Sequence, residues 1–144
     1  MKQYTLIHIG KVKEQFCQIG ITEFSKRIKS FQIITLKDSN KEKEGADILT
    51  QLTNTQYDII ITLDEHGEEY TSVNFSKFLQ EKQAEKMCFV IGGADGLSPE
   101  VLKVATKKIA LSKMTFTHEM AQLFFIEQLY RAQSILEGKK YHRV

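Results

Sequence analysis

Short apolar runs recur along the chain and predict five β-strands. They cover residues 4–9, 31–36, 57–63, 87–91 and 109–111. Some of them hold consecutive β-branched residues, as residues 59–61 do, which is typical of parallel strands buried on both faces. The stretches between the runs place apolar residues at helical spacing: Phe16, Ile19, Phe24 and Ile28, then Val73, Phe75, Phe78 and Leu79. This alternation predicts an α/β fold, a mostly parallel sheet with helices on both faces.

The last predicted helix, residues 118–137, has a wide apolar surface. A stripe about 100° wide is enough to cover one core. This helix exceeds it, with Met120, Ala121, Leu123, Phe124, Phe125, Ile126, Leu129, Tyr130, Ala132, Ile135 and Leu136. A second apolar face in so small a chain favours a subunit interface, and therefore a homodimer. The alternative is a central helix that its own chain covers on all sides.

Length and composition fit one globular domain spanning residues 1–144. Apolar residues make up 42% and charged residues 26%, and a single Pro and eight Gly leave no linker-like tract. No leader segment and no apolar stretch near the ~20 residues of a membrane span are found, so we expect a cytoplasmic protein without a membrane partner.

Cys17 and Cys88 lack metal-ligand spacing and are expected to be buried free thiols. The net charge of +2 permits an RNA partner, more readily a large preformed surface than a naked strand.

Candidate chemistry follows three predicted strands, at the sheet edge where open α/β folds bind ligands. The three segments are residues 62–67, 91–99 and 111–118. The second holds Gly92-Gly93-x-x-Gly96, whose glycines let backbone approach a ligand closely. It matches neither the dinucleotide fingerprint nor the P-loop. The alternative interpretation is a tight strand-to-helix turn, with Ser98 as N-cap and Pro99 as the first helical residue.

Other polar residues have competing interpretations. Asp64 and Glu65 are either an acid/base pair or, as we favour, a solvated turn. His8, inside the first strand, is expected to be a structural histidine, and the four histidines lack metal-ligand spacing. The C-terminal residues 138–144 are either a frayed basic end or a segment that stacks on a base and holds a phosphate.

Several segments together resemble one known family. They are HIGKVKE, ITEFSKRI, LDEHGEEYTSVNFSKFL, FVIGGADGLSPEV, ALSKMTFTHEM, FFIEQLYRAQSIL and the terminal YHR. In order and nearly in spacing, they are similar to the bacterial 23S rRNA pseudouridine-N3 methyltransferases of the SPOUT class, the RlmH family. The resemblance covers essentially the whole chain.

The resemblance implies a fold, a cofactor and a substrate. The fold is an α/β knot, in which the C-terminal segment threads through a loop, a rare exception to chain-crossing rules. S-adenosyl-L-methionine sits in the knot. Its implied contacts are Leu63, Gly93, Ser112, Lys113, Met114, Thr115, Phe116 and Thr117. The implied substrate is N3 of a pseudouridine in ribosomal RNA within the assembled ribosome.

The resemblance also implies a homodimer with its active site between the subunits. The terminal Tyr141, His142 and Arg143 match the family's last motif and are the expected catalytic residues. We expect His142 to be the general base or an orienting group, Tyr141 to stack on the target base, and Arg143 to hold a phosphate.

The chain departs from the family pattern in its fifth-strand loop and beyond. Thr117 stands where the family commonly has Pro, and Gln122 where it commonly has Arg. The segment before residues 41–45 is also shorter than usual. The loss of the arginine favours a rival hypothesis, a non-catalytic RNA- or ribosome-binding relative. The glycine loop alone suggests a third, a small nucleotide-binding α/β module.

Overall fold

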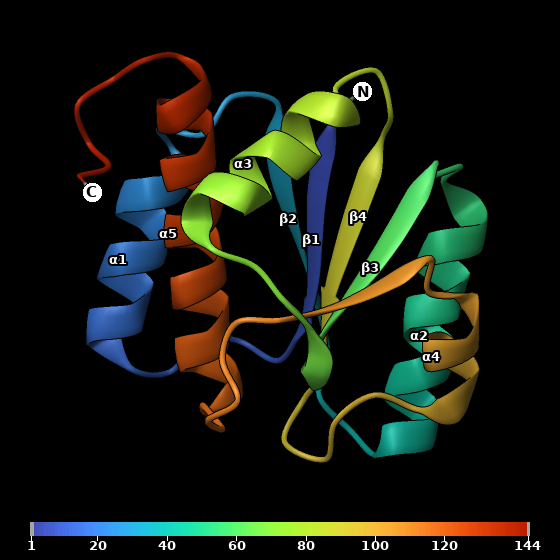
Figure 1. Ribbon diagram of the computed structural model, residues 1–144. Coiled ribbons are helices and arrows are strands. Elements are labelled where there is room, and N and C mark those ends of the chain that lie inside the picture. Colours follow the sequence, from blue (N-terminus) through green and yellow to red (C-terminus); the bar gives the residue numbers. More distant parts are fainter. Residues whose placement is uncertain (1, 144) are drawn as a thin grey trace.

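The computed structural model describes residues 2–143 and contains a five-stranded sheet flanked by helices (Figure 1). Along the chain the elements are β1 (Tyr4–Ile9), α1 (Gln15–Ser25), β2 (Phe31–Leu36), α2 (Lys41–Asn54), β3 (Ile59–Glu69), α3 (Ser72–Glu81), β4 (Met87–Ile91), α4 (Pro99–Val104), β5 (Lys107–Ala110) and α5 (His118–Leu136). The strands lie in the order β2-β1-β4-β3-β5, and every pairing is parallel. The predicted α/β class and parallel sheet are confirmed.

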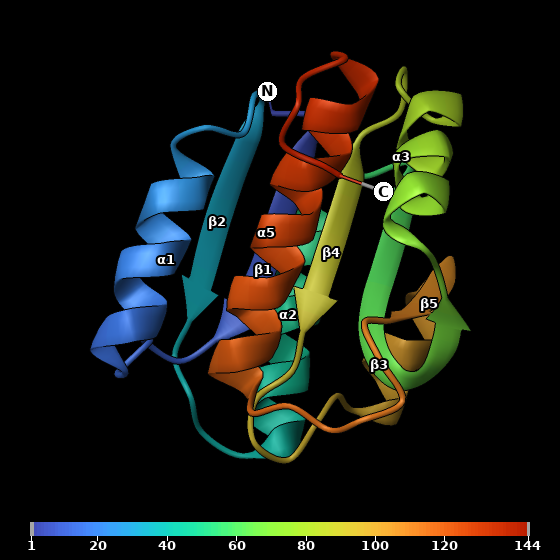
Figure 2. The same ribbon diagram turned by 60° about the vertical axis from the view of Figure 1, so that its left-hand side comes forward.

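Helices cover both faces of the sheet, as the buried strands predicted. Every residue of β1 and β4 is buried. On one face, Leu6 and Phe89 pack with α1, α3 and α5; on the other, Ile7 and Val90 pack with α2 and α4 (Figure 2). The sheet therefore separates the core into two layers.

β3 is longer than its apolar run predicted. It continues from Ile59 to Glu69, and the register with β5 shifts between Leu63 and Glu68. Gly67 permits this path, because a Cβ there would stand 2.7–2.8 Å from backbone atoms of Lys108 and Ile109. Of the favoured solvated turn at Asp64 and Glu65, the turn was wrong, because both residues lie within the strand, inside its irregular part; Glu65 is exposed.

α5 shares its wide apolar surface among several neighbours. Phe125, Ile126 and Leu129 are buried in the core, and the helix also packs against α1 and α3. Gly20 of α1 allows a close approach, since a Cβ there would meet the Leu123 side chain at 2.6 Å.

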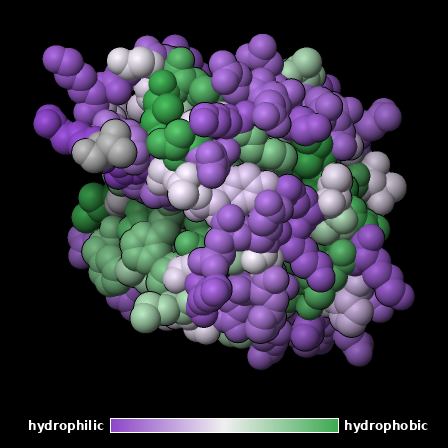
Figure 3. Space-filling model, viewed as in Figure 1, coloured by the Kyte–Doolittle hydropathy of each residue, from purple (hydrophilic) through white to green (hydrophobic). Residues whose placement is uncertain are grey.

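An apolar area formed by side chains of α1 and α5 stays exposed. Phe16 is 57% exposed, Ile19 62% and Phe124 37%. Figure 3 shows an apolar area over the region of α1 and α5. We call these three side chains the exposed apolar strip. Within residues 2–143, no helix is both long enough and apolar enough to cross a bilayer.

Candidate functional site

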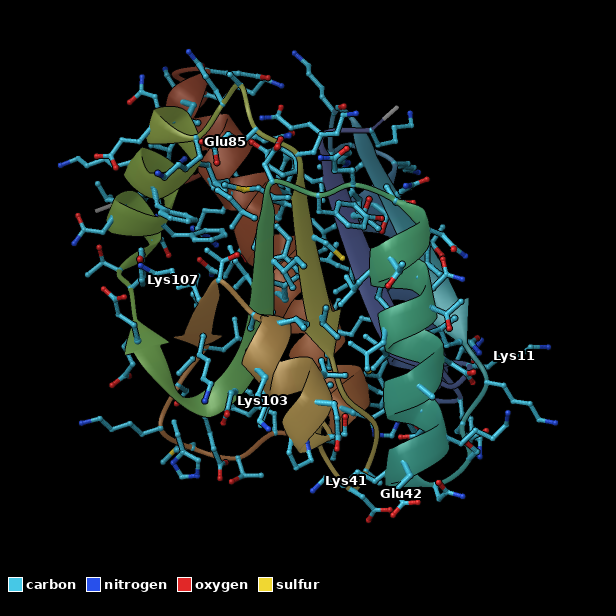
Figure 4. The ribbon with its side chains drawn as sticks, turned by 90° about the vertical axis from the view of Figure 1, so that its right-hand side faces the viewer. Lys11, Lys41, Glu42, Glu85, Lys103 and Lys107 are labelled. Atoms are coloured by element: carbon cyan, nitrogen blue, oxygen red, sulfur yellow. The ribbon has the colours of Figure 1, made fainter. Side chains whose placement is uncertain are left out.

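The loops that follow β3, β4 and β5 meet at one edge of the sheet, because parallel strands direct their carboxyl ends the same way. They enclose a cleft of about 1040 Å³. Its walls include residues 63–66, 91–97 and 114–121, and the start of α2 adds Lys41 (Figure 4). The three segments singled out from the sequence are thus brought together.

Seven of the eight expected cofactor residues line this cleft: Leu63, Gly93, Ser112, Met114, Thr115, Phe116 and Thr117. Lys113 is the exception. Its side chain is exposed, and its Nζ lies 3.8 Å from Glu69 Oε1. The structure therefore assigns Lys113 to the outer surface of this loop.

The glycine loop is both a tight turn and a wall of the cleft. The Gly96 N–H donates to the Gly93 oxygen at 3.0 Å, and Gly96 has a φ of +79°. A Cβ on Gly92 would lie 2.7 Å from the Gly96 carbonyl carbon. Ser98 then caps α4 by accepting the Val101 N–H at 3.3 Å.

A buried carboxylate lies behind the glycine loop. Glu44, in the first turn of α2, is 6% exposed, and its Oε2 accepts the Ser39 N–H at 2.8 Å. Its Oε1 lies 3.0 Å from the position that a Cβ on Gly93 would take. The sequence patterns did not reveal Glu44, because its neighbour in space is far away along the chain.

The segment after β5 is held by local hydrogen bonds. Ser112 Oγ accepts the Met114 N–H at 3.0 Å, and Thr117 caps α5 by accepting the Met120 N–H at 3.2 Å. The Thr115 hydroxyl donates to Glu65 Oε2 at 2.5 Å, which ties this segment to the irregular part of β3. These bonds fix the path of the backbone along the cleft.

Glu119 joins the starts of α1 and α5. Its Oε1 accepts the N–H groups of Lys13 and Glu14 at 3.1 and 3.0 Å. Burial opposes ionisation, but the two N–H donors stabilise the carboxylate and hold the pKa of Glu119 below its ordinary value. This contact brings Glu14 and Cys17 to the cleft wall. Cys17 is a buried free thiol, as predicted, and burial raises its pKa.

His8 and Gln122, which the sequence singled out, both lie in the core. His8 is 4% exposed, its Nε2 lies 2.7 Å from Thr35 Oγ1, and burial lowers its pKa to about 4. It is structural, as predicted, although its Nδ1 has no partner within the described residues. Gln122 is 2% exposed and does not line the cleft. The exchange of the family's arginine therefore falls at a buried position.

The C-terminal residues 139–143 pack against α1 and the end of α5. The Tyr141 ring lies 4.8 Å from the Tyr130 ring, between centroids, and the Arg131 guanidinium lies 4.8 Å from the Tyr141 centroid. Arg131 Nη1 is 3.0 Å from His142 Nδ1. Burial and the nearby Glu127 carboxylate raise the pKa of Tyr141. These contacts favour an ordered segment over a frayed end.

This tail lies far from the cleft of its own chain. The cleft is at the first residues of α5, and the tail follows its last ones (Figures 1 and 2). A helix rises about 1.5 Å per residue, so the 19 residues of α5 span roughly 28 Å. One chain therefore does not bring Tyr141, His142 and Arg143 to its own expected cofactor site.

Comparison with known proteins gives consistent matches along the whole chain. The family model described as "Predicted SPOUT methyltransferase" matches residues 1–142. The ribosomal RNA large subunit methyltransferase H of Synechococcus sp. strain CC9311 is 46% identical over 138 residues, covering 96% of this chain and 94% of the relative. The protein of the same name from Prochlorococcus marinus strain MIT 9303 is 41% identical over 140 residues, covering 97% and 92%.

Solved structures share the fold at low sequence identity. The SpoU methyltransferase AviRb from Streptomyces viridochromogenes, in complex with the cofactor AdoMet, aligns with a TM-score of 0.55 at 10% identity, covering 92% of this chain and 59% of that one. The A. aeolicus TrmH/SpoU tRNA modifying enzyme aligns with a TM-score of 0.52 at 17% identity, covering 96% and 78%. With a full-length family match and relatives above 40% identity, this chain belongs to the SPOUT methyltransferase family.

Proposed function

We propose that this protein methylates ribosomal RNA of the large subunit with S-adenosylmethionine as methyl donor. The observation that carries the proposal is the cleft between the loops after β3, β4 and β5, in a chain whose curated relatives are named as large-subunit rRNA methyltransferases. The proposed acceptor is N3 of a pseudouridine in 23S rRNA of the assembled ribosome. Action on ribosomes would place the protein in the cytoplasm.

The residues of the cleft fit such a cofactor. Its volume of about 1040 Å³ suits a large ligand, since ligand pockets span roughly 300–1,000 Å³. Gly93 lets the backbone of this loop pack closely against Glu44 and Ile9, where a side chain would push the loop out of place. Backbone around Leu63, Gly93 and residues 112–117 would hold the cofactor. When bound, S-adenosylmethionine supplies a methyl group on a positively charged sulfur.

The protein's own task is then to align and deprotonate the acceptor. The N3 proton of a pseudouridine is weakly acidic and must leave as the bond from nitrogen to the methyl carbon forms. Alignment supplies up to about 7–11 kcal/mol, and a general base about 10²–10⁴-fold in rate. We propose His142 as the base or orienting group, Tyr141 as a stacking platform for the base, and Arg143 as a phosphate ligand.

We propose that a second copy of the chain completes the site. Tyr141, His142 and Arg143 lie at the opposite end of α5 from their own cleft. A homodimer that covers the exposed apolar strip, Phe16, Ile19 and Phe124, would allow the tail of one copy to enter the cleft of the other. The contacts of the tail with Tyr130 and Arg131 are made within one chain, and in the proposed dimer the tail would leave them for the partner's cleft.

Two measurements test the proposal in sequence. Calorimetry is expected to show S-adenosylmethionine binding to the purified protein. Transfer of labelled methyl groups to 70S ribosomes that lack the modification is expected to follow. Binding to cofactor and ribosome without transfer would favour the non-catalytic relative. Failure to bind the cofactor would reject the methyltransferase proposal altogether.

A further inference from the structure

The cleft between the loops after β3, β4 and β5 carries a negative charge. Five residues that line it have carboxylates: Glu14, Asp64, Glu65, Asp95 and Glu119. Among the described residues of the lining, Lys41 alone has a positively charged side chain. With histidine neutral, five carboxylates against one ammonium give the lining a formal charge of −4, whereas the whole chain has a net charge of +2. The negative charge is therefore concentrated in the cleft.

Hydrogen bonds hold some of these carboxylates without cancelling their charge. Glu119 Oε1 accepts the backbone N–H groups of Lys13 and Glu14 at 3.1 and 3.0 Å. Glu65 Oε2 accepts the Thr115 hydroxyl at 2.5 Å. These donors are neutral groups, so they fix the carboxylates in place and leave the negative charge at the cleft wall.

A sixth carboxylate, that of Glu44, lies behind the cleft wall. Its Oε1 is 3.0 Å from the position that a Cβ on Gly93 would take, and Gly93 itself lines the cleft. The Ser39 N–H donates to the other oxygen, Oε2, at 2.8 Å. Glu44 also lies in the first turn of α2, at the end of a helix that favours negative charge. The carboxylate is thus held in place directly behind a residue that a ligand would contact.

The charge of Glu44 is the one that water screens least. Its side chain is 6% exposed, whereas the five carboxylates of the lining are half-buried or exposed. A charge acts more strongly through protein than through water, because protein has the lower effective dielectric constant. Glycine at position 93 permits this short separation, since a side chain there would push the loop away from the carboxylate.

Binding of RNA does not account for a negative cleft. The backbone of RNA carries one negative charge on each phosphate, and surfaces that bind nucleic acid are ordinarily basic. Carboxylates in the cleft repel such a backbone. They favour a ligand of positive charge, and the methyl donor of the proposed reaction has a positively charged sulfur.

We propose that the negative charge of the cleft, with Glu44 as its buried member, selects the charged cofactor over its demethylated product. This inference rests on the function proposed above and adds to it the basis of cofactor selectivity. S-adenosylmethionine and S-adenosylhomocysteine differ by one methyl group and by the positive charge on sulfur, because the electrons of the broken C–S bond stay on the sulfur atom. The carboxylates therefore attract the donor, and this attraction is lost when the methyl group has been transferred.

Glu44→Gln tests the role of the buried charge. Glutamine keeps the length of the side chain and an acceptor for the Ser39 N–H, but it removes the charge. Calorimetry gives the dissociation constants of S-adenosylhomocysteine and S-adenosylmethionine, and the ratio of the first to the second measures selectivity. In Glu44→Gln this ratio is expected to fall roughly 3- to 30-fold, the effect of one charge–charge interaction that is partly screened.

Glu42→Gln is the matched control. Glu42 lies in the same turn of α2 as Glu44, but it is exposed and does not line the cleft (Figure 4). Its loss is expected to leave the ratio unchanged. A purely structural role of Glu44 would weaken the binding of both ligands alike, and an unchanged ratio in Glu44→Gln would therefore overturn the proposal. An equal fall of the ratio in Glu42→Gln would overturn it too.

Asp95→Asn gives a second measurement that does not depend on the buried position. Asp95 is exposed in the glycine loop, so this variant is expected to fold and to lower the ratio less than Glu44→Gln does. Circular dichroism checks the fold of each variant. If Glu44→Gln does not fold, an unchanged ratio in Asp95→Asn would overturn the proposal.

Methyl transfer separates this inference from the proposed function. Methylation of ribosomes by the intact protein, together with an unchanged ratio in Glu44→Gln, would overturn the selection by charge and leave the function intact. A ratio that falls in Glu44→Gln, when the intact protein transfers no methyl groups to ribosomes, would do the reverse. Failure of the intact protein to bind S-adenosylmethionine would reject both.

Discussion

Two neighbouring residues, Gly93 and Glu44, shape one wall of the cleft. The Glu44 carboxylate fills the space behind Gly93, and the glycine backbone forms part of the cleft wall. The glycine was marked in the sequence by its motif. The carboxylate was not, because a first-turn glutamate is ordinarily a solvated helix residue.

Gly93→Val is expected to abolish S-adenosylmethionine binding while the protein stays folded. A Cβ at this position already lies 3.0 Å from Glu44 Oε1 and 3.3 Å from Ile9 Cγ2, so the bulkier side chain would push the glycine loop away from these neighbours and change the wall of the cleft. Calorimetry measures the affinity, and circular dichroism checks the fold. Ala46→Val on the exposed side of α2 is the control. Unchanged affinity in Gly93→Val would contradict the assignment of this loop.

Glu119 gives a pH-dependent contribution to stability. Its pKa is depressed in the folded protein, so the contribution is full above the unfolded pKa of about 4.3 and is lost as the pH falls through the lower folded value. The difference in Tm between the protein and its Glu119→Gln variant should therefore be constant above about pH 5 and shrink below pH 4. A difference that grows toward low pH would refute this role.

Among the elements, β3 departs furthest from its sequence pattern. Its apolar run ends near Leu63, yet the strand resumes pairing at Glu68 after a register shift. Periodicity cannot predict such a shift, because the residues concerned are polar and their pairing with β5 is non-local. The buried runs of β1 and β4, by contrast, were predicted with their observed bounds, since consecutive apolar residues report burial directly.

Gly67→Ala is expected to destabilise the irregular part of β3. The new Cβ would lie 2.7–2.8 Å from backbone atoms of Lys108 and Ile109, which cannot rotate away as a side chain can. Forcing atoms into such packing typically costs about 1–3 kcal/mol. Urea unfolding measures the loss, and Glu69→Ala, exposed on the same strand, is the control. Equal stability of the two variants would show that the strand end adjusts freely.

At the scale of the molecule, the tail and the cleft lie at opposite ends of α5. The sequence identified both as candidate regions, on motif and on the resemblance. The sequence could not predict how far apart the tail and the cleft lie, because that distance depends on the length and packing of α5. The knot and the dimer implied by the resemblance stay predictions, and the dimer is the arrangement that unites the two regions.

Mixing two inactive variants tests whether the tail acts between subunits. One lacks residues 141–144, and the other is Gly93→Val. Each is expected to transfer methyl groups at least about 10²-fold more slowly than the intact protein, through loss of a general acid–base group or of the cofactor. In a mixed dimer one site regains an intact cleft and an intact tail. Activity that recovers on mixing supports the exchange, and activity that stays at the level of the separate variants would contradict it.

The position of the transferred methyl group tests the central claim most directly. Ribosomes lacking the modification are incubated with the protein and S-adenosylmethionine, and the nucleosides of their 23S rRNA are analysed by mass spectrometry. We predict one new methyl group, on N3 of a pseudouridine, that is absent when cofactor or protein is omitted. A methyl group on another type of nucleoside, or none on 23S rRNA from ribosomes that bind the cofactor-loaded protein, would contradict this account.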